Sequence, residues 1–163
     1  MSMNYRNTQY GRRYLLVPLV VGFLLILDAF LPGQAIPWQA YLIATSAVGL
    51  TTLAFTSLTV RDAGDRLVVQ FGPIPLFWKT IPYRAITRVE KGRTRFSDGW
   101  GIHYSPTGGW VLNVWGFDCV HIWCGRRLFS VGTDDPDGLL AFLENKIQEY
   151  QDNNRNDSQD ASS

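Results

Sequence analysis

Two different patterns of apolar residues divide the chain near residue 56. Residues 14–31 and 38–55 form two almost uninterrupted apolar runs. Asp28, in the first run, is the single charged residue between positions 14 and 60. Each run, at about 1.5 Å per residue, makes a helix of about 27 Å, close to the thickness of a bilayer core. The linker PGQAIP is so short that it predicts a tight reversal. We therefore expect a transmembrane helical hairpin over residues 14–55.

The positive charges lie outside this hairpin. Arg12 and Arg13 precede the first run, and Arg61 and Arg66 follow the second. Positively charged flanks stay on the cytoplasmic side of a membrane, so both termini are expected to face the cytoplasm. Residues 1–13 are then a cytoplasmic N-terminal segment.

Two features of the hairpin allow a second interpretation. A small-residue site at Gly33–Ala35 is compatible with cleavage of a signal peptide, but the first run is longer than the apolar core of such peptides. Asp28 is a functional candidate because ionisable groups inside a membrane are rare. Its position near the outer end of the first run favours a carboxylate that reaches interfacial water.

Beyond residue 56 the apolar residues alternate in short runs separated by turn residues, as in Leu67, Val69 and Phe71. This pattern is typical of a β-sandwich or barrel. The expected strands are residues 57–60, 66–71, 76–81, 86–91, 100–104, 110–115, 118–124 and 127–131.

The spacing changes to that of a helix near Gly132. Carboxylates at Asp134, Asp135 and Asp137 suit the exposed N–H groups of a helix start, and Pro136 suits its first turn. Apolar residues then recur every three or four positions up to residue 150, which predicts an amphipathic helix against the sheet. Residues 56–150 are thus one domain, and the polar tail 151–163 is expected to be disordered.

The hairpin is followed by LTVRDAGDRLVVQFGP, then IPYRAITRVEKG, and finally RRLFSVGTDDPDGLLAFLE. This order resembles small bacterial membrane proteins that carry a pleckstrin-homology-like domain, over residues 14–150. The resemblance implies about seven antiparallel strands in a partly open sandwich or barrel, capped by one C-terminal helix. It places that domain on the cytoplasmic side of a bacterial inner membrane with two spans. It implies no catalytic residue.

Composition excludes several classes of function. The 15 basic and 14 acidic residues are balanced, which argues against a nucleic-acid-binding protein. Neither a nucleophile elbow nor a glycine-rich phosphate loop followed by a helix is present. We therefore expect a protein that is not an enzyme and that uses no cofactor.

One cluster of residues raises the question of a metal site. The candidate ligands are Cys119, His121 and Cys124, with His103 and Asp118 nearby. Successive residues of a strand point to opposite faces, so Cys124 faces away from the other two. No metal site is expected.

Basic residues concentrate between positions 84 and 95, where five cations and one acid give a net charge of +4. These cations are Arg84, Arg88, Lys91, Arg93 and Arg95. Such a cluster beside a membrane is attracted to anionic lipid. The alternative is a solvated loop, and both interpretations stay open.

Aromatic residues occur on both faces of the later strands. One set must fill the core, so a surplus is available for a contact surface. The candidates are Trp100, Trp110, Trp115 and Trp123.

The leading functional hypothesis is a non-enzymatic, membrane-anchored interaction module. Its domain would be held at the inner leaflet for a protein partner or for self-association. One alternative is an anionic-lipid sensor that uses residues 84–95. Another is an auxiliary subunit of a membrane complex.

Overall fold

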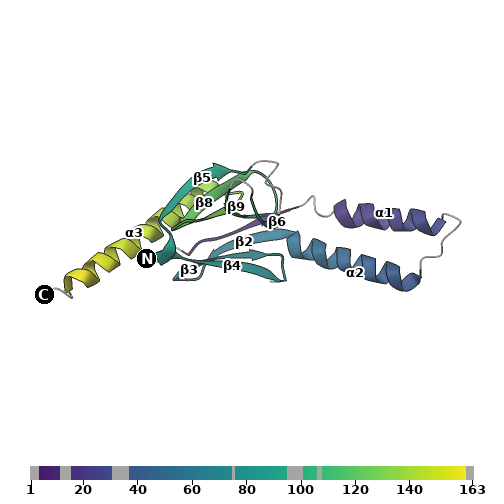
Figure 1. Cartoon of the computed structure of the whole chain (residues 1–163), viewed down its shortest axis with the longest axis horizontal. Helices are drawn as coiled ribbons and strands as arrows, with labels where there is room; N and C mark the ends of the chain where they lie inside the picture. Colours follow the sequence, from purple (N-terminus) through teal and green to yellow (C-terminus); the bar gives the residue numbers. More distant parts are fainter. Residues whose placement is uncertain are drawn as a thin grey trace.

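The computed structural model describes residues 4–11, 16–30, 37–74, 76–94, 101–105 and 108–160. A β domain of two sheets forms the middle of the molecule (Figure 1). Helices α1 (Leu16–Phe30) and α2 (Trp38–Phe55) project side by side from one end of this domain. Helix α3 (Pro136–Asp160) covers the other end and extends beyond it.

The first sheet is a four-stranded antiparallel sheet in the order β1-β2-β3-β4. Its strands are β1 (Arg6–Tyr10), β2 (Ser57–Asp62), β3 (Arg66–Phe71) and β4 (Phe77–Pro82). The tight β2–β3 turn is possible because Gly64 adopts a φ of 85°, which other residues rarely reach. β1 and β4 are the edge strands.

The second sheet is five-stranded, in the order β5-β8-β9-β7-β6. β7 pairs with β9 in parallel, and the other pairs are antiparallel. The strands are β5 (Arg88–Arg93), β6 (Gly101–Tyr104), β7 (Trp110–Asn113), β8 (Asp118–Cys124) and β9 (Arg127–Gly132). The short helix η2 (Tyr83–Ala85) links β4 to the segment that leads into β5.

The hydrophobic core lies between the sheets and under α3. Alternate residues of the strands supply it, because successive side chains point to opposite faces. Its fully buried members include Leu58, Val60, Leu67, Val69, Phe71, Ile81, Val120, Ile122, Val131, Leu139 and Leu143.

Helix α3 starts where its acidic cluster predicts. The Gly138 N–H donates to the Asp135 side chain at 3.0 Å, so Asp135 is the N-cap and Pro136 the first helical residue. Farther along, the Phe142 ring stacks on Tyr5 at 5.2 Å and meets Tyr83 edge-on at 6.1 Å. Tyr5 comes just before β1 and Tyr83 just after β4, so these contacts fix α3 to the residues that flank the first sheet.

The prediction of a transmembrane hairpin over residues 14–55 is wrong. Among the described residues, no helix is both long enough and apolar enough to cross a membrane. α1 has 15 residues and so a length of about 22 Å, well short of a bilayer core. α2 reaches 18 residues, but Gln39, Thr45 and Ser46 lower its hydropathy. Three predictions that depend on this hairpin are therefore wrong as well: the two spans, the inner-membrane location and the membrane as an integral partner.

Three further expectations need correction. Residues 6–10 belong to the expected cytoplasmic N-terminal segment but form β1, because main-chain pairing with β2 requires no apolar pattern. The parallel β7–β9 pair shows that the strands are not all antiparallel. The tail was expected to be disordered from residue 151, but α3 continues to Asp160. Arg12, Arg13 and the linker 31–36 lie outside the described residues.

Candidate functional site

The predicted basic segment is paired with acidic residues in the folded chain. Arg88 forms an ion pair with Glu90, and Lys91 Nζ lies 2.8 Å from a carboxylate oxygen of Asp137 at the start of α3. Arg93 pairs with Asp118 on the neighbouring strand at 3.3 Å. Arg84 is exposed on η2, and Arg95 lies outside the described residues.

These pairs change the electrostatics of the segment. Two of the three acids come from β8 and α3, far away in sequence, so the charge of +4 along the chain is offset in space. Exposed pairs contribute little to stability, but they place negative charge beside each cation. The attraction of residues 84–95 for an anionic surface is weakened accordingly.

The predicted tryptophan surface is not continuous. Trp123 is half-buried beneath the Arg88 guanidinium, which lies 4.9 Å from the ring centre. Trp115 is half-buried against the core, and its carbonyl oxygen accepts a hydrogen bond from Gln9 at 2.7 Å. Trp110 is 43% exposed and meets Tyr104 edge-on. Trp100 lies outside the described residues.

Two of the candidate metal ligands, His121 and Asp118, are engaged in other contacts. The described residues contain no group of three or more side chains placed to hold a metal ion. His121 Nδ1 lies 2.9 Å from the Ser130 hydroxyl on the paired strand. A Cβ on Gly92 would lie 2.2 Å from the His121 ring, so glycine at position 92 makes room for the ring across β5. Burial raises the pKa of the Cys124 thiol, which keeps it protonated and unreactive.

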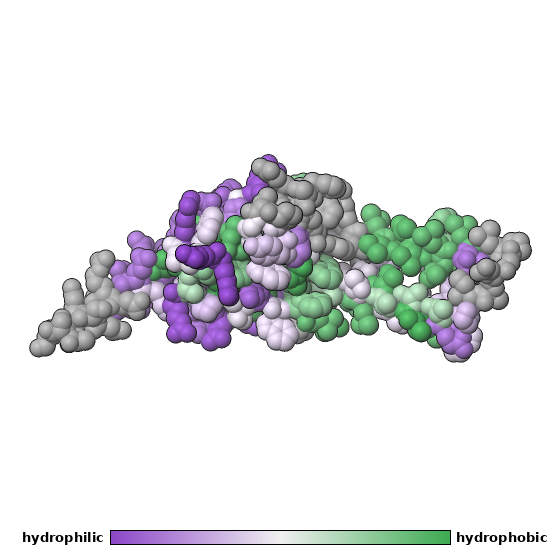
Figure 2. Space-filling model, viewed as in Figure 1, coloured by the Kyte–Doolittle hydropathy of each residue, from purple (hydrophilic) through white to green (hydrophobic). Residues whose placement is uncertain are grey.

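The most extensive apolar surface is the helix pair α1–α2. The two helices bury only a narrow strip against each other, which includes Val21 and Leu25 of α1 and Ala44 and Val48 of α2. Most large side chains outside this strip are apolar and exposed, and the face of the pair seen in Figure 2 is mainly hydrophobic. Its large exposed side chains are Leu16, Val17, Leu19, Val20, Phe23, Leu24, Ile26, Leu27, Phe30, Trp38, Leu42, Ile43, Leu50 and Leu53.

Several polar side chains of this helix pair form hydrogen bonds within the pair. The Thr45 and Thr51 hydroxyls each donate to a carbonyl oxygen of their own helix at 2.8 Å. The Tyr41 hydroxyl donates to the Asp28 carboxylate at 2.7 Å, which raises the pKa of Tyr41. The donors of these three hydroxyls are therefore already used within the helix pair.

The apolar surface continues from the helix pair onto the β domain. Phe55 at the end of α2 stacks on Phe77 of β4 with ring centres 6.0 Å apart. Ile74 and Leu76, in the β3–β4 turn, are also exposed. The turn approaches α2 closely at Gly72, where a Cβ would lie 2.7 Å from the Leu53 carbonyl oxygen. The apolar runs of the sequence predict the two helices, but they do not predict this extension.

Comparisons with known proteins add no relative. No protein-family model, no curated protein and no solved structure matches the chain. The resemblance to pleckstrin-homology-like proteins stays a prediction. Function is therefore argued from the surfaces described above.

Proposed function

We propose that this chain is a non-enzymatic assembly module, in which the helix pair α1–α2 binds further copies of the same chain and the β domain is presented beside it. The observation that carries the proposal is the large number of apolar side chains that the two helices expose. An apolar surface in contact with water is unfavourable by about 25 cal/mol per Å². Covering it with protein removes that cost.

The size of the surface exceeds what an ordinary monomer exposes. Helices of 15 and 18 residues that lie side by side present two faces, each roughly 20 Å by 25 Å. The two faces together amount to roughly 1,000 Å², compared with about 300–600 Å² for the largest apolar patch of a typical monomer. The surface is large enough for a stable interface between subunits.

The chemistry of the surface favours a second copy as its occupant. Asp28 is the one ionisable carboxylate on the described parts of α1 and α2, and it is hydrogen-bonded to Tyr41 within the pair. A complementary partner must therefore be apolar and uncharged over a similar area. The same helix pair of another copy meets this requirement, and a two-fold interface brings identical surfaces together.

The test is the mass of the full-length chain in solution at a series of concentrations. Light scattering coupled to size exclusion should give an integer multiple of 18.4 kDa for the wild type. The double variant Val20→Glu, Leu27→Glu puts two charges on one exposed face of α1 and should shift the mass toward the monomer. A wild-type mass equal to one copy at every concentration would contradict the proposal.

A matched control separates the interface from general effects of charge. Arg61→Glu changes an exposed residue of β2 on the β domain. It should leave the mass unchanged, with the same circular dichroism as the wild type. A double variant of α1 that stays folded and keeps the wild-type mass would overturn the assignment of this face.

A further inference from the structure

The two sheets part at one side of the β domain and leave a small apolar cavity. The cavity has a volume of about 170 Å³. It is lined by Phe71 and Trp78 of the first sheet, by Ile102, Trp110, Leu112 and Phe129 of the second, and by Lys79. We call this cavity and its rim the mouth of the sandwich.

Lys79 is placed on the inner side of the first sheet by its register. It pairs with Val69, which is fully buried, so the two side chains point to the same face. Its ammonium lies 5.3 Å from the centre of the Phe129 ring, across the mouth on the second sheet. The cation therefore belongs to the rim of an apolar cavity.

Two arginines of the second sheet lie beside the mouth. The β8–β9 turn contains Arg126 and is closed by Gly125, whose φ is 60°. Arg127 precedes Phe129 by two residues on β9 and so shares its face. Both arginines line a shallow hollow whose wall, Trp110, also lines the cavity.

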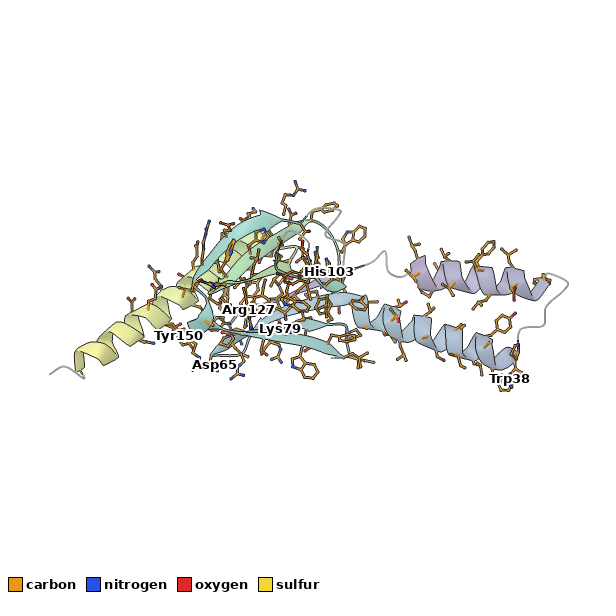
Figure 3. All side chains as sticks on the ribbon, in the orientation of Figure 1. Trp38, Asp65, Lys79, His103, Arg127 and Tyr150 are labelled. Carbon is orange, nitrogen blue, oxygen red and sulfur yellow. The ribbon has the colours of Figure 1, made fainter. Side chains whose placement is uncertain are left out.

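Lys79 and Arg127 both lie near Cys124 of the second sheet. Cys124 is the register partner of Arg127, and the positive charge of Lys79 acts on the Cys124 thiol. Figure 3 labels Lys79 and Arg127 in the same central part of the β domain. With Arg126, these residues form a group of three cations that we call the rim cations.

The rim cations differ from the basic segment 84–95 in their pairing. None of the three rim cations forms an ion pair with any residue that the structure describes. In the basic segment, three of the four described cations are paired. Positive charge is therefore available at the mouth, where it adjoins apolar walls.

We propose that the mouth binds a small anion with an apolar body, of the class of arylalkyl carboxylates. Its ring would enter the cavity between the two sheets, against Phe71 on one side and Phe129 on the other, and its carboxylate would lie at the rim cations. A cavity of about 150 Å³ lined by apolar side chains holds a benzene molecule, so the volume here suits a single ring. Guanidinium groups are well matched to a carboxylate, which they bind with two parallel hydrogen bonds.

The experiment uses the full-length chain and 3-(4-fluorophenyl)propanoate, observed by ¹⁹F NMR. Binding should broaden and shift the fluorine signal in a saturable way. The neutral probe 3-(4-fluorophenyl)propanamide has the same ring without the charge and should bind about tenfold more weakly. Equal binding of the two probes, or non-saturable binding, would overturn the proposal.

Variants separate the mouth from the apolar helix pair, which also offers apolar surface. Lys79→Gln with Arg127→Gln should weaken binding of the carboxylate at least tenfold while leaving the amide unaffected. Ile102→Trp fills the cavity and should abolish binding of both probes. The matched control Arg88→Gln with Lys91→Gln removes two paired cations on β5 and should bind like the wild type.

An inward lysine on an edge strand also discourages pairing between edge strands of two molecules. If that is the only role of Lys79, its variant changes the mass of the chain and leaves the fluorine signal unchanged. That result overturns the ligand proposal and leaves the proposed function of the helix pair intact. Loss of probe binding in a variant that melts like the wild type supports the ligand site.

Discussion

The helix pair and the β domain are both rich in apolar residues, but the β domain buries these residues and the helix pair exposes them. In the β domain Leu58, Val69 and Ile122 are 0–1% exposed. On the helix pair Leu19, Phe23 and Phe30 are 62–83% exposed. Two sheets and α3 enclose a volume between them, whereas two helices side by side share only one strip of contact.

This difference separates two roles for apolar residues. The buried ones hold the β domain together, and each contributes through contacts within its own chain. The exposed ones on α1 and α2 contribute little to the fold of a single chain and are available to other chains. Substitutions of the same kind should therefore have different effects in the two regions.

The largest effect is expected in the core under α3. Leu143 is fully buried, so Leu143→Ala should lower the free energy of unfolding by about 2–5 kcal/mol. Leu24→Ala on α1 removes the same atoms from an exposed position and should change the unfolding of the β domain by less than about 0.5 kcal/mol. Urea unfolding followed by near-UV circular dichroism measures both. A large effect of Leu24→Ala would remove the distinction between the regions.

A smaller effect is expected at alkaline pH, where the β domain contains buried tyrosines. Burial, with the nearby Asp135 charge, raises the pKa of Tyr5 from 10.0 to about 12. The unfolded chain then ionises first, so the stabilisation is complete below pH 10 and is lost as the pH rises toward 12. We expect a loss of about 1–2 kcal/mol across this range, discounted for partial exposure.

Tyr83 acts in the same direction, because burial and its hydrogen bond to Asp62 raise its pKa strongly. Tyr5→Phe should therefore remove part of the pH dependence, and Tyr5→Phe with Tyr83→Phe should remove most of it. Chemical unfolding at pH 9, 10, 11 and 12 is the measurement. An unchanged slope in the double variant would place the alkaline transition elsewhere.

The smallest effect is expected at the surface of the β domain. Lys91 and Asp137 are paired at 2.8 Å, and their side chains are 50% and 78% exposed. A double-mutant cycle of Lys91→Ala and Asp137→Ala should give a coupling free energy below about 0.5 kcal/mol. The coupling should shrink further in high salt because the pair is exposed to solvent. A coupling above about 1 kcal/mol would show that the basic segment stabilises the docking of α3.

Local sequence patterns predicted much of the β domain, because strand alternation and helix capping depend on residues that are close together in the chain. Alternation marked β2 and β3 close to their observed bounds, since a strand buries every second residue. The acidic cluster marked the start of α3, since Asp135 satisfies exposed N–H groups of the first turn. β1 lacked such a pattern, and its pairing depends on a partner strand far along the chain.

The candidate sites were predicted less well because they depend on distant residues. The sequence by itself determined which stretches are apolar, where most strands lie and where cations are dense. Tertiary structure decided that Asp118 and Asp137 offset the dense cations, and that Lys79 lies over the Phe129 ring at the mouth. It also decided that the apolar helices bury only one strip. Charge and burial are properties of neighbours in space, and neighbours from different sheets are not visible in the order of residues.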